Sequence, residues 1–181
     1  MKKLLIFLPL IALSLSLYGE TQLLQIEKEK SKVEVEVNVT AHSFIATLEN
    51  YEIKIQTDTE SVKIKSTEFS FDFNALKTGK NSRDKAMLKW EEYNKYPNSS
   101  FILNKLHKQG EKVIAEGMLT LHGIEKEIRF PIKVKTEGTK WSISGSTVID
   151  HLDWDLPIIK KFVLKVDPNL SVKFHLEGVL N

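Results

Sequence analysis

The segment from Asp150 to Asp155 combines a histidine with three aspartates, side chains that could transfer protons or bind a cation. His151 and Asp153 could serve as acid and base, which would make the protein a hydrolase or isomerase acting on an amphiphile. The aspartates could also bind a hard cation, but the segment lacks the fixed glycine and final glutamate of a calcium loop. The pattern therefore favours ordinary turn chemistry over a catalytic or metal site.

The remaining polar residues add little catalytic or metal-binding chemistry. The five histidines lack the close spacing of zinc motifs; they are His42, His107, His122, His151 and His175. The chain has no cysteine, which excludes disulfides, thiol catalysis, thiolate metal sites and a lipid-modified cysteine. No nucleophile elbow, phosphate loop or His-Glu metalloprotease motif occurs. We therefore expect a non-enzymatic protein without metal or cofactor, in which His122 holds a hairpin by a hydrogen bond.

A helix is expected over residues 81–96, where strand-like alternation is lost. Asn81 or Ser82 would cap its first amide groups, and Pro97 would stop it. Its apolar side would consist of Met87, Leu88, Trp90 and Tyr93.

Basic side chains on the same segment could bind the head of an amphiphile. If a ligand carries a phosphate or another polar head, Arg83, Lys85 and Lys89 could meet it with charge-assisted hydrogen bonds. The alternative is a solvated helix face with no binding role.

Most of the chain alternates apolar and polar residues, as strands with one buried face do. The clearest example is Ile128, Phe130, Ile132 and Val134, which alternate with charged residues or proline. We expect strands near residues 31–40, 45–56, 60–74, 99–106, 112–121, 126–137, 140–150, 160–166 and 169–178. Short turns between them indicate an antiparallel meander, and so long a sheet is expected to curl shut. The prediction is an all-β fold with one short helical segment, in which a barrel of about eight strands is filled by side chains or holds one small ligand.

The composition is typical of one globular domain: 181 residues, 41% hydrophobic and 28% charged. Two lysines followed by an apolar run to Leu17 predict a signal peptide at residues 1–19, with a mature periplasmic domain at residues 20–181. An uncleaved anchor is disfavoured because the run is shorter than the roughly 20 apolar residues that span a bilayer. Removal of Lys2 and Lys3 leaves 24 basic and 24 acidic residues, and a neutral domain is not expected to bind nucleic acid.

Three motifs resemble one family, in order and spacing, from about Ser31 to Leu176. They are Leu76-Lys77-Thr78-Gly79 with Arg83-Asp84 and Leu88, then Tyr96-Pro97 followed by Phe101, and then Gly117-Met118-Leu119-Thr120-Leu121-His122-Gly123. These motifs are similar to those of the exported YceI-like polyisoprenoid-binding proteins. The chain departs from that family at Asp150–Asp155, where an Arg and a Gly are common, and at Ala41–Phe44.

The resemblance implies a lipocalin-like antiparallel β-barrel that encloses an apolar cavity, and a non-enzymatic protein that holds a polyisoprenoid lipid or quinone tail. It also suggests a role in envelope stress. Each buried methylene contributes about 0.8 kcal/mol, so a long tail needs few polar contacts. The candidate pocket residues are Phe69, Phe71, Phe73, Leu76, Met87, Leu88, Trp90, Phe101, Leu119, Leu121, Phe130 and Trp154.

The same residues could instead simply fill a core. Met87, Leu88 and Trp90 are the favoured ligand contacts, because their segment could cover a barrel mouth where a tail enters. A filled barrel that acts through a protein partner is a third possibility, and the sequence also leaves a homodimer open.

Overall fold

The computed structural model of the protein describes residues 21–40, 42–58, 63–161 and 164–180. The expected signal peptide, residues 1–19, lies outside the described residues. The described chain forms one sheet of twelve strands and a second sheet of two. The main sheet contains β1 (Thr21–Leu23), β2 (Gln25–Ile26), β3 (Lys32–Val39), β4 (His42–Leu48), β5 (Glu52–Asp58), β6 (Lys63–Asp72), β7 (Leu76–Lys77), β8 (Asn98–Gln109), β9 (Lys112–Leu121), β10 (Ile124–Glu137), β11 (Lys140–Asp150) and β14 (Asn169–Val179). The other elements are β12 (Lys160–Lys161), β13 (Leu164–Lys165), the helix α1 (Asn81–Trp90), and the 3-10 helices η1 (Lys28–Lys30), η2 (Phe73–Ala75) and η3 (His151–Trp154).

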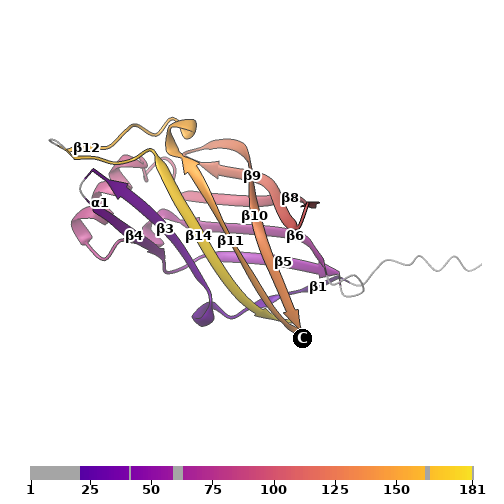
Figure 1. Ribbon diagram of the computed structural model, residues 1–181. Coiled ribbons are helices and arrows are strands. Elements are labelled where there is room, and N and C mark those ends of the chain that lie inside the picture. Colours follow the sequence, from indigo (N-terminus) through magenta and orange to yellow (C-terminus); the bar gives the residue numbers. More distant parts are fainter. Residues whose placement is uncertain (1–20, 41, 59–62, 162–163, 181) are drawn as a thin grey trace, which may run out of the picture.

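The main sheet is antiparallel and strongly curled. Its strand order is β1-β5-β6-β8-β9-β10-β11-β14-β3-β4-β7, with β2 paired to β14. Helix α1 and β12 lie at one end of the molecule, and the C-terminus lies at the other (Figure 1). Among the described residues, the end strands β1 and β7 do not pair with each other, so the sheet is a half-barrel in its hydrogen bonding. The predicted all-β, lipocalin-like fold with one short helix is confirmed.

The β9–β10 hairpin turns at His122 and Gly123, as the sequence predicts. Both residues have positive φ angles, 49° and 72°, which suit a two-residue hairpin turn. Gly123 has a second reason to lack a side chain, because a Cβ there would lie 2.5 Å from the ring of Tyr96. The hairpin therefore packs closely against the segment that follows α1.

The expected single strand at residues 45–56 is wrong. The structure has two strands there, β4 and β5, joined by residues 49–51. The buried side chains change phase across this loop: Ala46 and Leu48 are buried in β4, whereas Tyr51 and Ile55 are buried after it. A change from even to odd positions requires a break in the strand, and the sequence contains this signal.

The expected strand at residues 160–166 is also wrong. Strands β12 and β13 pair with each other, so this segment is a small antiparallel hairpin, and the residues between them lie outside the described residues. Strands β1, β2 and β7 were not predicted, because two or three residues are too few to show alternation.

The helix is shorter than predicted and starts differently. It ends at Trp90, and Glu92 then adopts a left-handed conformation with φ 53°, well before Pro97. Lys80 occupies the N-cap position without a side-chain hydrogen bond, so the predicted capping by Asn81 or Ser82 is wrong. No helix in the described part of the chain is long and apolar enough to cross a membrane.

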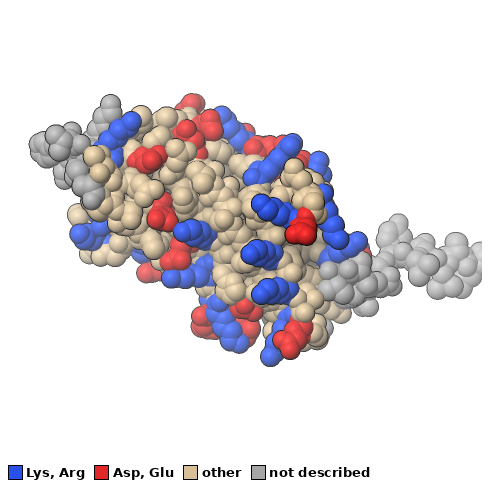
Figure 2. Space-filling view, in the orientation of Figure 1, with Lys and Arg blue, Asp and Glu red and all other residues tan. Residues whose placement is uncertain are grey.

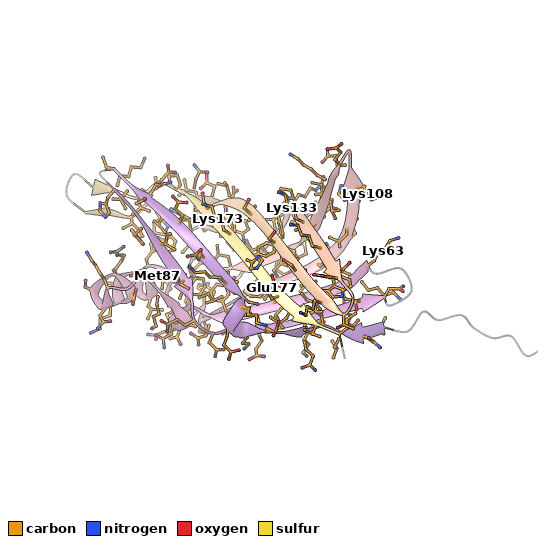
Figure 3. The ribbon with its side chains drawn as sticks, turned by 60° about the horizontal axis from the view of Figure 1, so that its bottom comes forward. Lys63, Met87, Lys108, Lys133, Lys173 and Glu177 are labelled. Carbon is orange, nitrogen blue, oxygen red and sulfur yellow. The ribbon has the colours of Figure 1, made fainter. Side chains whose placement is uncertain are left out.

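The outer face of the sheet carries charges of both signs. Figure 2 shows Lys and Arg side chains interspersed with Asp and Glu on one face of the molecule. Lys133 of β10 and Lys173 of β14 are exposed on the sheet, whereas Met87 of α1 lies at the helical end (Figure 3). Apolar residues at the alternate strand positions are left to cover the inner face.

Candidate functional site

The inner face of the curled sheet is covered by three apolar clusters, which we name after Trp141, Trp154 and Phe130. The buried members of the Trp141 cluster are Leu24, Val33, Ala46, Leu48, Tyr51, Ile55, Leu76, Trp141, Ile143 and Leu176; those of the Trp154 cluster are Phe73, Leu121, Ile149, Trp154 and Leu156; those of the Phe130 cluster are Ala115, Phe130 and Ile132. Partly buried side chains pack against each cluster and connect them. Phe71 contacts the first two, and Ile128 contacts the last two.

All twelve candidate pocket residues lie in or against these clusters. Phe69, Phe71, Leu76 and Met87 belong with the Trp141 cluster; Phe73, Leu88, Trp90, Leu119, Leu121 and Trp154 with the Trp154 cluster; and Phe101 and Phe130 with the Phe130 cluster. The structure therefore brings them together on one side of the sheet. Their role in holding a ligand stays a prediction.

Burial divides these candidates into two groups. Phe73, Leu76, Leu121, Phe130 and Trp154 are buried and fill the core. The others are only half-buried, although they pack against the interior clusters: Phe69, Phe71, Met87, Leu88, Trp90, Phe101 and Leu119. A half-buried apolar side chain on an inner face still has surface to offer an apolar ligand.

Aromatic rings form two continuous rows along this inner surface. Tyr51, Phe69, Phe71 and Phe73 follow one another with ring centroids 5.6, 5.9 and 5.1 Å apart. In the second row, Phe130 lies 5.5 Å from Phe101 and 6.0 Å from Phe174. Tilted rings at these distances pack favourably and present a largely apolar surface.

Arg83 on α1 is held at the edge of the interior. Its guanidinium carbon lies 3.8 Å from the ring centroid of Phe44, a cation–π contact from α1 to β4. Its Nη1 atom is buried and has no hydrogen-bond partner among the described residues. A buried guanidinium donor without an acceptor suits an anionic or carbonyl oxygen.

The other two head-group candidates differ from Arg83, because Lys85 and Lys89 are exposed on α1. The start of the helix is fixed by the buried Asp84, which accepts hydrogen bonds from the amide of Thr78 at 3.0 Å and from its hydroxyl at 2.5 Å. Burial acts to raise the pKa of Asp84, but the Thr78 hydrogen bonds and the nearby Lys77 and Arg83 charges outweigh it and hold the pKa below its ordinary value. Ionised Asp84 therefore anchors the start of α1, on which Arg83 lies.

A buried polar group that the sequence does not reveal lies at the end of α1. Glu91 is fully buried, and neither of its carboxyl oxygens has a hydrogen-bond partner among the described residues. Burial raises the pKa of Glu91 to about 8, although the nearby backbone amide of His122 acts in the opposite direction. The carboxyl group is therefore mostly protonated at neutral pH.

Histidines close this end of the inner face. His122 Nδ1 lies 3.0 Å from the carbonyl oxygen of Trp154, so the hydrogen bond predicted for this residue exists and ties the hairpin to η3. His151 Nδ1 lies 3.0 Å from the carbonyl oxygen of Leu156. Since a carbonyl oxygen only accepts, each Nδ1 donates, and both Nε2 atoms are buried without a hydrogen-bond partner among the described residues.

The structure does not support an acid–base pair at Asp150–Asp155. His151 is fully buried, whereas the side chain of Asp153 is 63% exposed and pairs with Lys126 at 3.9 Å. Asp150 accepts a hydrogen bond from the amide of Leu152 at 3.0 Å, which is the expected turn chemistry. Among the described residues, no group of three or more His, Asp or Glu side chains could hold a metal ion.

The sequence of the chain matches the YceI-like domain over residues 24–178, which is most of its length. The chain belongs to the YceI-like domain family. No curated protein sequence matches it. The YceI-like assignment agrees with the curled antiparallel sheet and with the helix between β7 and β8.

Solved structures share this YceI-like fold at low sequence identity. BcnA of Burkholderia cenocepacia is 18% identical, with a TM-score of 0.75, and the match covers 84% of this chain and 99% of BcnA. A polyisoprenoid-binding domain from Saccharophagus degradans, implicated in plant cell wall breakdown, is 14% identical, with a TM-score of 0.67 over 90% of this chain and 100% of that domain. The YceI protein of Campylobacter jejuni is 18% identical, with a TM-score of 0.65 over 75% of this chain and 84% of that protein.

Proposed function

We propose that this YceI-like domain is an exported binding protein that holds the tail of a long-chain amphiphile, such as a polyisoprenoid lipid or a quinone, against its inner face. The observation that carries the proposal is the half-buried state of inward-facing side chains such as Phe69, Phe101 and Leu119. Family membership and the polyisoprenoid-binding domain with the same fold support it. No catalytic step is needed for this function.

The energetics of such a site depend on the tail. At about 0.8 kcal/mol for each buried methylene, several prenyl units would outweigh the cost of immobilising the ligand, which is roughly 4–15 kcal/mol. The inner face supplies two aromatic rows for this contact. Specificity for the tail is then expected to be low, and the polar head would decide between ligands.

We place an anionic or carbonyl head group at Arg83. Its buried Nη1 atom has no hydrogen-bond partner in the described part of the chain, and its contact with Phe44 fixes this donor beside the apolar surface. Lys85 and Lys89 are exposed and are expected to contribute only a weak, screened attraction. A neutral quinone carbonyl and a phosphate could both accept from Arg83.

The N-terminal pattern supports export to the periplasm, with residues 1–19 as a cleaved signal peptide. In that compartment the domain would carry its lipid between membranes or store it, with a role in envelope stress. The hydrolase or isomerase alternative gains no support, because His151 is buried and Asp153 is exposed.

The test is native mass spectrometry of the mature protein purified from its own organism, followed by solvent extraction of whatever mass is released. A prenyl lipid or quinone at one molecule per chain is the expected result. An unliganded mass that also refuses added prenyl lipids would contradict the proposal and favour a filled barrel that acts through a protein partner. The same spectrum checks whether the protein is a homodimer.

A further inference from the structure

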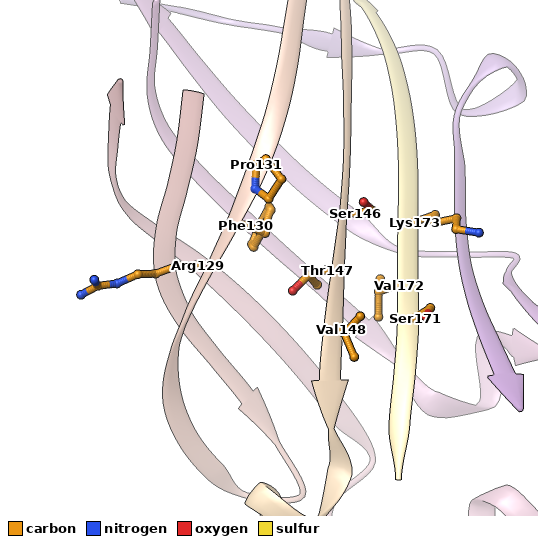
Figure 4. Close-up of a pocket in the computed structure, with 9 residues that line it drawn as sticks. All are labelled: Arg129, Phe130, Pro131, Ser146, Thr147, Val148, Ser171, Val172 and Lys173. Carbon is orange, nitrogen blue, oxygen red and sulfur yellow. The ribbon is translucent and has the colours of Figure 1, made fainter. Parts of the chain in front are cut away.

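Strands β10 and β11 separate along half of their length. They pair from Glu137 and Lys140 only as far as Ile132 and Gly145. Beyond that point β10 stays paired to β9, and β11 stays paired to β14. Figure 4 shows the two strands diverging below Pro131. The wall of the half-barrel is therefore open here, although both strands continue.

Pro131 explains where the separation starts. Leu121 and Ile124 pair across a two-residue turn, so even-numbered residues of β10 exchange hydrogen bonds with β9, and odd-numbered residues direct their backbone groups towards β11. Pro131 is odd-numbered and has no N–H, so one rung between β10 and β11 cannot form. The ladder ends at the neighbouring residue.

A hollow of about 410 Å³ occupies the opening, within the size range of small-molecule sites. It is lined by residues 129–131 of β10, 146–148 of β11 and 171–173 of β14 (Figure 4). We call this opening the β10–β11 slot. Its rim includes the apolar side chain of Val148, which is 60% exposed to solvent.

The floor of the slot consists of interior side chains. Phe130 belongs to the Phe130 cluster, and Val172 packs against the Trp154 cluster. Gly145 contributes no side chain, and the ring of Phe174 occupies the space where its Cβ would lie. The slot therefore lies directly against side chains of the inner face.

The charged side chains at the rim of the slot are paired with carboxylates. Arg129 lies 3.1 Å from Glu116 and 2.8 Å from Glu127, and Lys173 lies 3.0 Å from Glu36. Both cations therefore have carboxylate partners of their own. Apart from Ser and Thr side chains, the rest of the lining is apolar, so an apolar chain can pass along the slot; these residues are Phe130, Pro131, Val148 and Val172.

We propose that the β10–β11 slot is a lateral entrance through which the apolar tail of the ligand reaches the inner face. The proposal rests on the proposed function and extends it, because it names a route other than the barrel mouth that the segment with Met87, Leu88 and Trp90 is expected to cover. A tail that enters through the wall can leave its head group outside until the tail is seated.

The test uses the absence of cysteine from the chain. Val148→Cys at the slot and Lys133→Cys on the paired part of β10 are each labelled with a bulky maleimide, since both positions are exposed. The rate of transfer of pyrene-labelled palmitate from phosphatidylcholine vesicles is then measured. We expect the label at position 148 to slow transfer roughly tenfold or more, and the label at position 133 to leave it unchanged.

A second variant acts on the backbone. Pro131→Val restores the missing backbone N–H, so it is expected to extend the ladder between β10 and β11 and to slow transfer in the same assay. Lys133→Val is the control, because it leaves every backbone N–H in place. Equal rates for the unlabelled protein and both slot variants would overturn the entrance proposal. If the unlabelled protein takes up no pyrene-labelled palmitate and no prenyl lipid, the proposed function itself is contradicted, and the entrance proposal falls with it.

Discussion

The carboxyl group of Glu91 lies beside the backbone amide of His122 in the interior and joins the end of α1 to the β9–β10 hairpin. The two residues belong to elements that are far apart in the sequence. Because burial raises the pKa of Glu91 to about 8, this carboxyl group is mostly neutral at neutral pH and becomes a buried charge in alkaline solution, although the His122 amide favours the charged form.

The burial of Glu91 predicts that the protein loses stability as the pH rises. The pKa of Glu91 in the folded protein, about 8, lies above the ordinary value of 4.5, so between these two pH values the folded state keeps a proton that the unfolded state releases. The free energy of unfolding then falls by up to about 1.4 kcal/mol per pH unit. The free energy of unfolding does not change with the titration of Glu91 below pH 4.5, and it levels off above about pH 8. Glu91→Gln should remove this dependence.

Urea unfolding at roughly pH 5, 7 and 9 checks the prediction. Glu92→Gln is the matched control, because Glu92 is exposed and its side chain pairs with Lys95 at 3.2 Å. We expect Glu91→Gln to be more stable than the natural protein at the highest pH. An identical pH dependence in the natural protein and Glu91→Gln would contradict a buried, protonated Glu91.

The turn of the β9–β10 hairpin predicts unequal costs for two glycine substitutions. Gly123→Ala and Gly138→Ala both place a side chain at a positive φ, 72° and 59°, which costs about 1–2 kcal/mol. Only at Gly123 does the new Cβ meet another group, the ring of Tyr96 at 2.5 Å, whereas nothing lies within 4 Å at Gly138. Gly123→Ala should therefore be the more destabilising in urea unfolding. Equal losses would show that the ring moves aside freely.

The proposed tail site predicts different effects for two neighbouring residues of β9. Leu119 packs against the Trp154 cluster, whereas Met118 lies opposite Ile102, which is 53% exposed on the outer face. Leu119→Trp should occupy ligand space and lower the affinity for a prenyl alcohol roughly tenfold, which is about 1.4 kcal/mol. Met118→Trp should leave it unchanged. Fluorescence titration measures the affinity of each variant for the prenyl alcohol, and thermal unfolding confirms that each variant is folded.

The fold could be predicted because alternation in the sequence reports burial directly. Phe130 and Ile132 are buried and Lys133 is exposed, as the pattern requires. The pattern gives no pairing partners, however. Apolar and polar residues alternate along β10 on both sides of Pro131, yet only the residues after Pro131 pair with β11. The opening in the wall therefore could not be predicted without the register of three strands.

The candidate site was predictable in its apolar part and not in its polar part. Phe69 and Phe101 lie inside because strand periodicity places them there. Glu91 stands in a charged segment that is expected to be solvated, and its burial depends on the distant hairpin. Arg83 differs from Lys89 for a similar reason, since Arg83 contacts the ring of Phe44 on the distant strand β4 and Lys89 is exposed.

Arg83 gives a prediction about the head group. Farnesyl diphosphate and farnesol share one tail and differ in charge, so the ratio of their affinities isolates the head. Arg83→Gln should lower the affinity for farnesyl diphosphate roughly tenfold or more and leave that for farnesol unchanged, because the buried Nη1 donor is lost. Lys89→Gln, on the exposed side of α1, is the control and should change neither affinity. Equal losses for both ligands would assign Arg83 to packing against Phe44 instead, and no loss for either would contradict its binding role.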